Sequence, residues 1–152
     1  MGLVDLTYEL CDATAITVTS GATAVLGTGA AINTVRDIGH GTPLYVRVTL
    51  NSALSSASAS SLQLQLVTAD NSALTTNVTI LQLSPAYATS STAIPAGRLL
   101  WETTLPSAGP NKYRAFVGLR QTNGGNTLDA ATVNAMITTH QIKTDTLPDA
   151  VN

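Results

Sequence analysis

Residues 36–50, RDIGHGTPLYVRVTL, contain the stretch that decides the fold class. In this window the alternating residues are Leu44, Val46, Val48 and Leu50 against Tyr45, Arg47 and Thr49. A period of two over seven residues is typical of a β-strand with one buried face. The Gly and Pro residues at 39–43 predict a turn before this strand, because Gly accepts positive φ and Pro presets its own φ. The window therefore predicts a β-sheet.

Other short segments with strand character follow one another along the chain, separated by turn signals, at 15–19, 22–26, 32–35, 62–66, 78–83, 99–105, 112–120 and 133–142. In 78–83 the apolar residues fall on both faces, and a β-bulge near Ile80 would reconcile them. Trp101 lies on the same face of its predicted strand as Leu99 and Leu105, which favours a place in the core. About eight strands at this spacing predict a β-sandwich or a barrel.

The composition supports one all-β domain. A chain of 152 residues is the size of a single domain, and its charged fraction of 11% is well below the roughly 25% of ordinary soluble domains. We expect an N-terminal arm at 1–12, a β-sandwich domain at 13–142 and a C-terminal tail at 143–152. The segments 51–61 and 84–97 read as long connections. The net charge of −2, without a basic cluster, predicts no direct nucleic-acid partner.

The residue types needed for chemistry do not occur in productive patterns. His40 and His140 lie far apart without H-x-H or C-x-x-C spacing, so no metal site is expected. The chain has no G-x-S-x-G elbow, and its two glutamates give no convergent pair for glycoside hydrolysis. Cys11 reads as a small buried hydrophobe, because neighbouring carboxylates raise a thiol pKa. We expect no enzyme activity, no catalytic residue and no cofactor.

Targeting signals are equally sparse. No apolar stretch approaches the roughly 18 residues of a membrane span, so no membrane partner is expected. The N-terminus lacks the basic and apolar regions of a secretory signal, which indicates synthesis in a reducing host cytoplasm.

Two parts of the chain resemble a known family. The R-D-I-G turn at 36–39 continues into G-x-P-L and an alternating strand, and a second strand, Lys112-Tyr113-Arg114, follows a turn rich in Pro and Gly. Both are similar to the capsid cement (decoration) proteins of podophage-type tailed phages. The resemblance extends over about 12–142. It implies a jelly-roll β-sandwich of about eight antiparallel strands on the outer capsid surface of a virion, forming a homo-dimer or homo-trimer that clamps neighbouring major capsid protein subunits.

The arm supplies the candidate contacts to the capsid or to a second copy, because its apolar residues precede any complete strand. These candidates are Leu3, Leu6, Tyr8 and Leu10. The alternative function is a carbohydrate- or receptor-binding β-sandwich module of a phage fibre or adhesin. It predicts aromatic side chains grouped with acidic or amide groups around a groove, and the sequence does not group the four tyrosines.

Overall fold

The computed structural model describes residues 9–16, 19, 21–31, 44–90, 92–105 and 116–138, with the backbone alone at 28–31. The described chain forms nine β-strands: β1 Glu9–Ile16, β2 Thr23–Ala31, β3 Tyr45–Leu50, β4 Ser60–Ala69, β5 Thr79–Leu83, β6 Tyr87–Thr89, β7 Leu99–Thr104, β8 Phe116–Asn123 and β9 Ala131–Thr138. Every strand pairing is antiparallel.

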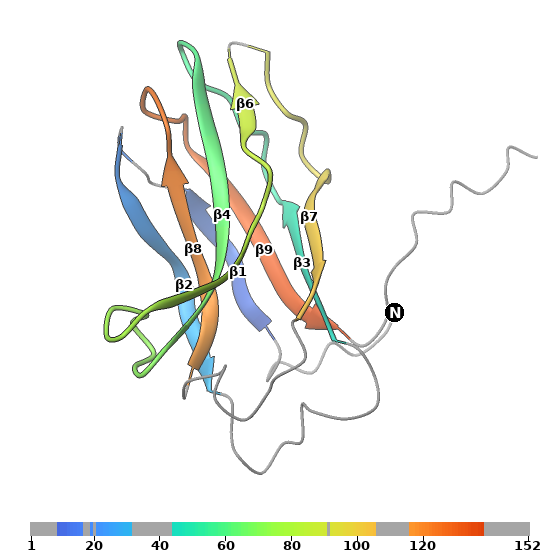
Figure 1. Ribbon diagram of the computed structural model, residues 1–152. Coiled ribbons are helices and arrows are strands. Elements are labelled where there is room, and N and C mark those ends of the chain that lie inside the picture. The colour runs from blue at the N-terminus through green and yellow to red at the C-terminus, as the bar shows by residue number, and fades with distance from the viewer. Residues whose placement is uncertain are drawn as a thin grey trace, which may run out of the picture.

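The strands form two packed sheets, one with the order β1-β9-β3-β7 and the other with the order β2-β8-β4-β5, in which β6 also pairs with β4 (Figure 1). Successive strands mostly alternate between the two sheets, and β1 pairs with the last described strand, β9. This connectivity is that of a jelly roll, the double-sheet architecture built from Greek keys. The predicted jelly-roll β-sandwich is therefore confirmed.

The ninth strand arises because one jelly-roll strand is broken in two. Both β5 and β6 pair with β4, and Ser84 and Pro85 lie in the break. Ser84 bridges the break: its N–H donates to the Leu64 carbonyl at 2.9 Å, and its Oγ accepts from the Leu64 N–H at 2.9 Å. Pro has no N–H to offer to a ladder. The Ser84 hydroxyl thus keeps the Leu64 backbone satisfied, and pairing resumes at Tyr87.

The core lies between the sheets and is built from the inward-facing residues of the alternating strands. Val46, Val48 and Leu50 are at most 1% exposed, as their period predicts. The same rule correctly places two other sets of side chains in the core, Leu62, Leu64 and Leu66 on β4, and Val117 and Leu119 on β8. Strand periodicity therefore identified the core-facing residues of β3, β4 and β8, whose burial stabilises the sandwich.

Trp101 lies in this core at 7% exposed, as predicted, but its expected neighbour Leu99 does not share its face. In the pairing of β3 with β7, Val48 of β3 lies opposite Trp101. The next residue of β3, Thr49, lies opposite Leu99, so Leu100 is the extra residue of a β-bulge in β7. The bulge turns Leu100 inward, where it is 7% exposed. Tyr87 from β6 donates its hydroxyl to the Leu100 carbonyl and so links the edges of the two sheets.

Two boundaries differ from the sequence-based expectation. β1 begins at Glu9, so the last residues of the predicted 1–12 arm belong to the sandwich. β4 begins at Ser60, inside the predicted 51–61 connection, and Leu54 in that connection is fully buried through a backbone bridge to Ile94. A single apolar residue among small polar residues gives no periodic pattern. The sequence of this segment is therefore typical of a loop, although Leu54 is buried.

Candidate functional surfaces

The predicted contact residues lie within the first ten residues of the chain, of which the structure describes Glu9 and Leu10. Leu3, Leu6 and Tyr8 lie outside the described residues. Leu10 lies in β1 and is 2% exposed within the hydrophobic core. A side chain already packed between the sheets cannot also bind a capsid subunit, so Leu10 is corrected to a core residue.

Strand β5 exposes apolar side chains whose exposure the sequence pattern did not predict. Ile80 is 49% exposed and Leu83 is 52% exposed, and no other large apolar side chain in the described part of the chain is exposed. The predicted bulge is present: Val67 pairs with Ile80 whereas Leu66 pairs with Gln82, so Leu81 is the extra residue. The bulge does not bury both apolar sets: Ile80 and Leu83 stay exposed on β5, which is an edge strand of its sheet.

This edge lacks the usual protection. Natural edge strands carry charged residues or Pro, which discourage pairing with another chain. The sequence of β5 is TILQL, which contains none of these residues. β5 therefore combines exposed apolar side chains with a strand edge that has no strand partner among the residues described.

A second, smaller apolar cluster lies beside β5, apart from the main core. Val67, Ala69 and Leu74 are fully buried there, packed against Val25, Val78 and Phe116. Leu74 has a φ of 52°, a left-handed conformation that is uncommon for a side chain with a Cβ. Its burial anchors the 70–78 loop to the sheet.

Asn71 gives this loop a defined shape. Its Oδ1 accepts from the N–H groups of Thr75 at 2.9 Å and Thr76 at 3.1 Å, and the Leu74 N–H donates to the Asn71 carbonyl at 3.1 Å. An Asn side chain that replaces a backbone acceptor is a common way to close a turn. These hydrogen bonds give the loop a defined conformation beside β5.

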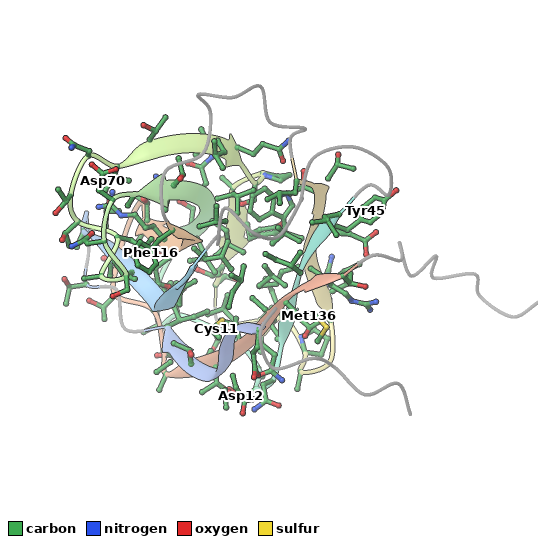
Figure 2. All side chains as sticks on the ribbon, turned by 90° about the horizontal axis from the view of Figure 1, so that it is seen from below. Cys11, Asp12, Tyr45, Asp70, Phe116 and Met136 are labelled. Atoms are coloured by element: carbon green, nitrogen blue, oxygen red, sulfur yellow. The ribbon has the colours of Figure 1, made fainter. Side chains whose placement is uncertain are left out.

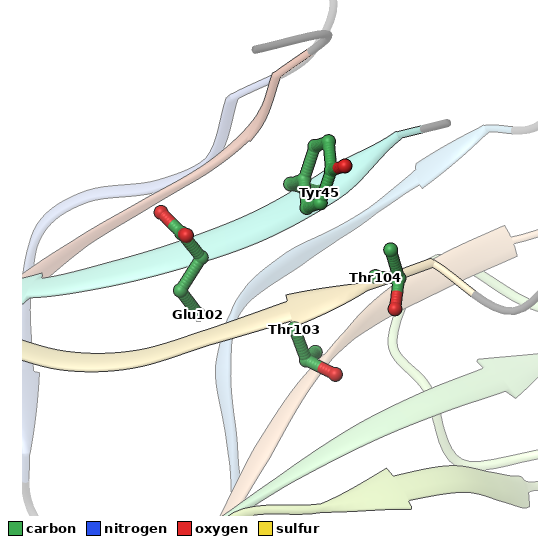
Figure 3. A pocket seen from close by; sticks show the side chains of 4 residues that line it. All are labelled: Tyr45, Glu102, Thr103 and Thr104. Carbon is green, nitrogen blue, oxygen red and sulfur yellow. The ribbon is translucent and has the colours of Figure 1, made fainter. Parts of the chain in front are cut away.

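A second surface lies on the other sheet. Tyr45 on β3 and Glu102, Thr103 and Thr104 on β7 line a cavity of about 390 Å³ (Figure 3). Tyr45 and Glu102 point to the same side of the sheet, and Thr103 points to the other side, where its hydroxyl donates to Gln82 Oε1. Figure 2 shows Tyr45 and Phe116 on opposite sides of the molecule, so this cavity is separate from the apolar cluster.

Two charged groups beside the cavity are incompletely satisfied. Arg47 lies directly opposite Glu102 in the β3–β7 register and opposite Met136 in the β3–β9 register. Arg47 Nη1 and Glu102 Oε2 are both buried, and neither forms a hydrogen bond within the described structure. Buried polar atoms of this kind are costly unless a partner is supplied.

The described residues contain no group of three or more His, Cys, Asp and Glu side chains that could hold a metal ion. His40 and His140 lie outside the residues described. Among the described residues there is also no helix long and apolar enough to cross a membrane.

Cys11 is buried, and its thiol lies 3.8 Å from the Val133 carbonyl oxygen. Burial raises the pKa of the Cys11 thiol from 9.0 to about 11, with smaller contributions from Glu9 and Asp12 in the same direction. The thiolate, which is the nucleophilic form, is thus disfavoured at neutral pH. This agrees with the interpretation of Cys11 as a packing residue.

The raised pKa of Cys11 predicts a loss of stability in alkali. The thiol ionises first in the unfolded chain, so its contribution to the free energy of unfolding is complete below pH 9 and falls as the pH rises toward 11. The total loss should be roughly 2–3 kcal/mol. Denaturant unfolding of the wild type and Cys11→Ser between pH 7 and 11 checks this, because other titrating groups are common to both proteins. Equal pH dependence in the two would contradict it.

Comparison of the chain with protein-family models and with curated protein sequences gives no match.

Proposed function

We propose that this protein is a capsid cement protein, which binds the outer surface of an assembled phage head as a homo-dimer or homo-trimer and joins neighbouring major capsid protein subunits. The proposal starts from the resemblance of Arg36–Leu50 and of the 112–114 strand to such proteins. The jelly-roll connectivity agrees with it, since viral capsid proteins are among the proteins that use this architecture. Fold alone does not define function, so the proposed role also requires a contact surface.

The observation that carries the proposal is the exposed edge strand β5. Ile80 and Leu83 provide apolar contact area, and the open backbone edge offers hydrogen bonds to a strand of another subunit. Peptide segments commonly bind proteins by adding a strand to such an edge. A strand of a capsid subunit, or β5 of a second copy, would cover both the side chains and the edge.

The low charge of the chain suits this role. A protein that joins capsid subunits needs a broad contact surface whose desolvation costs little free energy. Thr, Ser and Ala side chains are less costly to desolvate than charged ones. A head filled with DNA is under outward pressure, and many copies act on one shell. A few kcal/mol per copy is therefore sufficient, since about 1.4 kcal/mol changes an equilibrium tenfold.

The proposal predicts that heads assembled without this protein still form but lose DNA at a lower temperature, and that added protein restores them. A clamp added to a finished lattice strengthens its joints and carries no information about its shape. The double variant Ile80→Lys, Leu83→Lys should bind at least about tenfold more weakly, because two charges must be desolvated at the contact. Sedimentation of heads with bound protein measures the binding, and DNA release on heating measures the protection.

The matched control is Thr92→Lys, which adds a charge at an exposed position in the connection between β6 and β7. It should bind and protect heads as the wild type does, and thermal melting should show all variants folded. Failure of the wild type to bind heads would reject the cement function. If the double variant binds heads as tightly as the wild type, the contact lies on another surface.

A further inference from the structure

We propose that β5 joins two copies of this protein by antiparallel strand pairing about a twofold axis, so that the protein is a homo-dimer. This assembly rests on the proposed function, in which the strand that covers β5 then comes from a second copy and not from the capsid. Head binding becomes bivalent, because each dimer offers two copies to neighbouring capsid subunits.

The sheet edges of the described chain differ in their protection. The two sheets end at β1, β7, β2 and β5. β1 and β2 cover each other, since a Cβ on Gly27 would lie only 2.5 Å from the Leu10 carbonyl oxygen. β7 carries the charged Glu102. Within this part of the chain, β5 is thus the edge strand that neither another strand nor a charge protects from pairing.

The distribution of charge favours a second copy as the occupant of this edge. The sequence has no charged residue between Asp70 and Arg98, a stretch that contains β5, β6 and the loops on both sides of β5. Twofold symmetry brings the same surface of both copies together, so a charge near the axis would face its like. The β5 segment avoids this repulsion, which destabilises strand pairs.

The bulge in β5 places its two exposed apolar side chains on one face. Ile80 lies opposite Val67 of β4. Beyond the bulge, Leu83 lies opposite Gln65. Val67 and Gln65 alternate with the core-facing leucines of β4. Opposite residues in an antiparallel pair share a face, so Ile80 and Leu83 both face away from the main core. Without the bulge, two residues three positions apart would lie on opposite faces.

This arrangement is self-complementary. Val67 and Gln65 are two residues apart in β4, so Ile80 and Leu83 stand two rungs apart with the bulge between them. A twofold axis through the bulge places Ile80 of each copy opposite Leu83 of the other. These side chains, 49% and 52% exposed in one copy, would then form a single apolar cluster while the two backbone edges pair. Such an interface closes at two copies.

Gel filtration with light scattering, on the full chain without heads, tests the dimer. The wild type should have twice the chain mass of 15.6 kDa. Ile80→Lys, Leu83→Lys should weaken dimerisation at least about tenfold, since Lys then faces Lys in both pairs. Ile80→Lys, Leu83→Glu carries as many charges but places Lys opposite Glu, so it should remain more dimeric than the first double variant. Thr92→Lys should be as dimeric as the wild type.

Cysteine cross-linking tests the register. Cys11 is the only cysteine of the chain and is buried, so an introduced thiol is the accessible one. A mixture of Ile80→Cys and Leu83→Cys should form a disulfide-linked mixed dimer under mild oxidation, because opposite Cβ atoms lie close to disulfide distance. Either variant alone should cross-link much less, because identical positions are two rungs apart in this register.

A monomeric or trimeric wild type would overturn the proposal, as would a dimer that the Lys pair leaves intact or that both double variants weaken equally. Cross-linking of either cysteine variant with itself in place of the mixed pair would also overturn it. Thermal melting shows that each variant is folded. Head binding is measured separately. A monomer that binds heads would leave the cement function with a capsid strand on β5, whereas a dimer that binds no heads would reject the cement function and keep the β5 pairing.

Discussion

Trp101→Ala should lower the free energy of unfolding by about 3–5 kcal/mol, which is enough to unfold a marginally stable domain. Trp101 is the only tryptophan of the chain and lies 7% exposed between the sheets, where truncation leaves a cavity that the surrounding strands cannot fill. Chemical denaturation followed by circular dichroism measures the loss. The native emission of the wild type should also be blue-shifted relative to the unfolded chain.

The bulge in β7 supplies a matched comparison for this prediction. Leu100→Ala should cost about 2–5 kcal/mol because Leu100 is turned into the core, and Leu99→Ala should cost clearly less because Leu99 is only partly buried. A simple alternation would reverse this order. Red, water-like Trp101 emission together with a mild loss of stability in Trp101→Ala would show that β7 does not pack as described.

Gly27→Ala should destabilise the protein by about 2–5 kcal/mol, which combines the cost of a left-handed residue with that of overpacking. Gly27 has a φ of +69°, and a Cβ at this position would lie 2.5 Å from the Leu10 carbonyl oxygen and 2.8 Å from Cys11 Cβ. Leu10 and Cys11 belong to β1, so the methyl group would push β1 away from β2. The measurement is again denaturant unfolding.

Gly21 provides the control for this substitution. Its φ of +71° is nearly the same, but a Cβ there would meet nothing within 4 Å. Gly21→Ala should therefore cost only the conformational part, about 1–2 kcal/mol. The difference between the two variants measures the contact between β1 and β2, and equal losses would mean that this contact is not close.

The sequence predicted the elements that follow a simple period. Val46, Leu64 and Val117 each lie in a strand whose alternation correctly identified the buried face, because a strand repeats every two residues whatever its partners are. The bulge near Ile80 could also be predicted, because apolar residues on both faces of one short strand do not fit a simple alternation. The rule failed at Leu100, where an extra residue reverses the alternation and the strand itself gives no sign of it.

The candidate surfaces were less predictable than the core, for a related reason. Tyr45 and Glu102 are far apart in the sequence and meet only through the register of β3 and β7. Ile80 was visible as a strand residue, but its exposure depends on β5 lying at a sheet edge, which is a property of the whole topology. The signal that could have found β5 is the absence of any charged residue or Pro in a short apolar strand.

The pairing of β1 with β9 also determines how quickly the chain reaches its native state. Cys11 and Val133 meet across 122 residues of sequence, and every strand of the four-stranded sheet pairs with strands that are distant in the chain. Proteins dominated by such non-local pairings fold in roughly milliseconds to seconds, because the entropy of closing long loops is lost before native contacts offset it. During that interval the uncharged β5 segment is available to other nascent chains. Rapid synthesis at high concentration therefore favours aggregation through the same edge that the proposed head contact would cover.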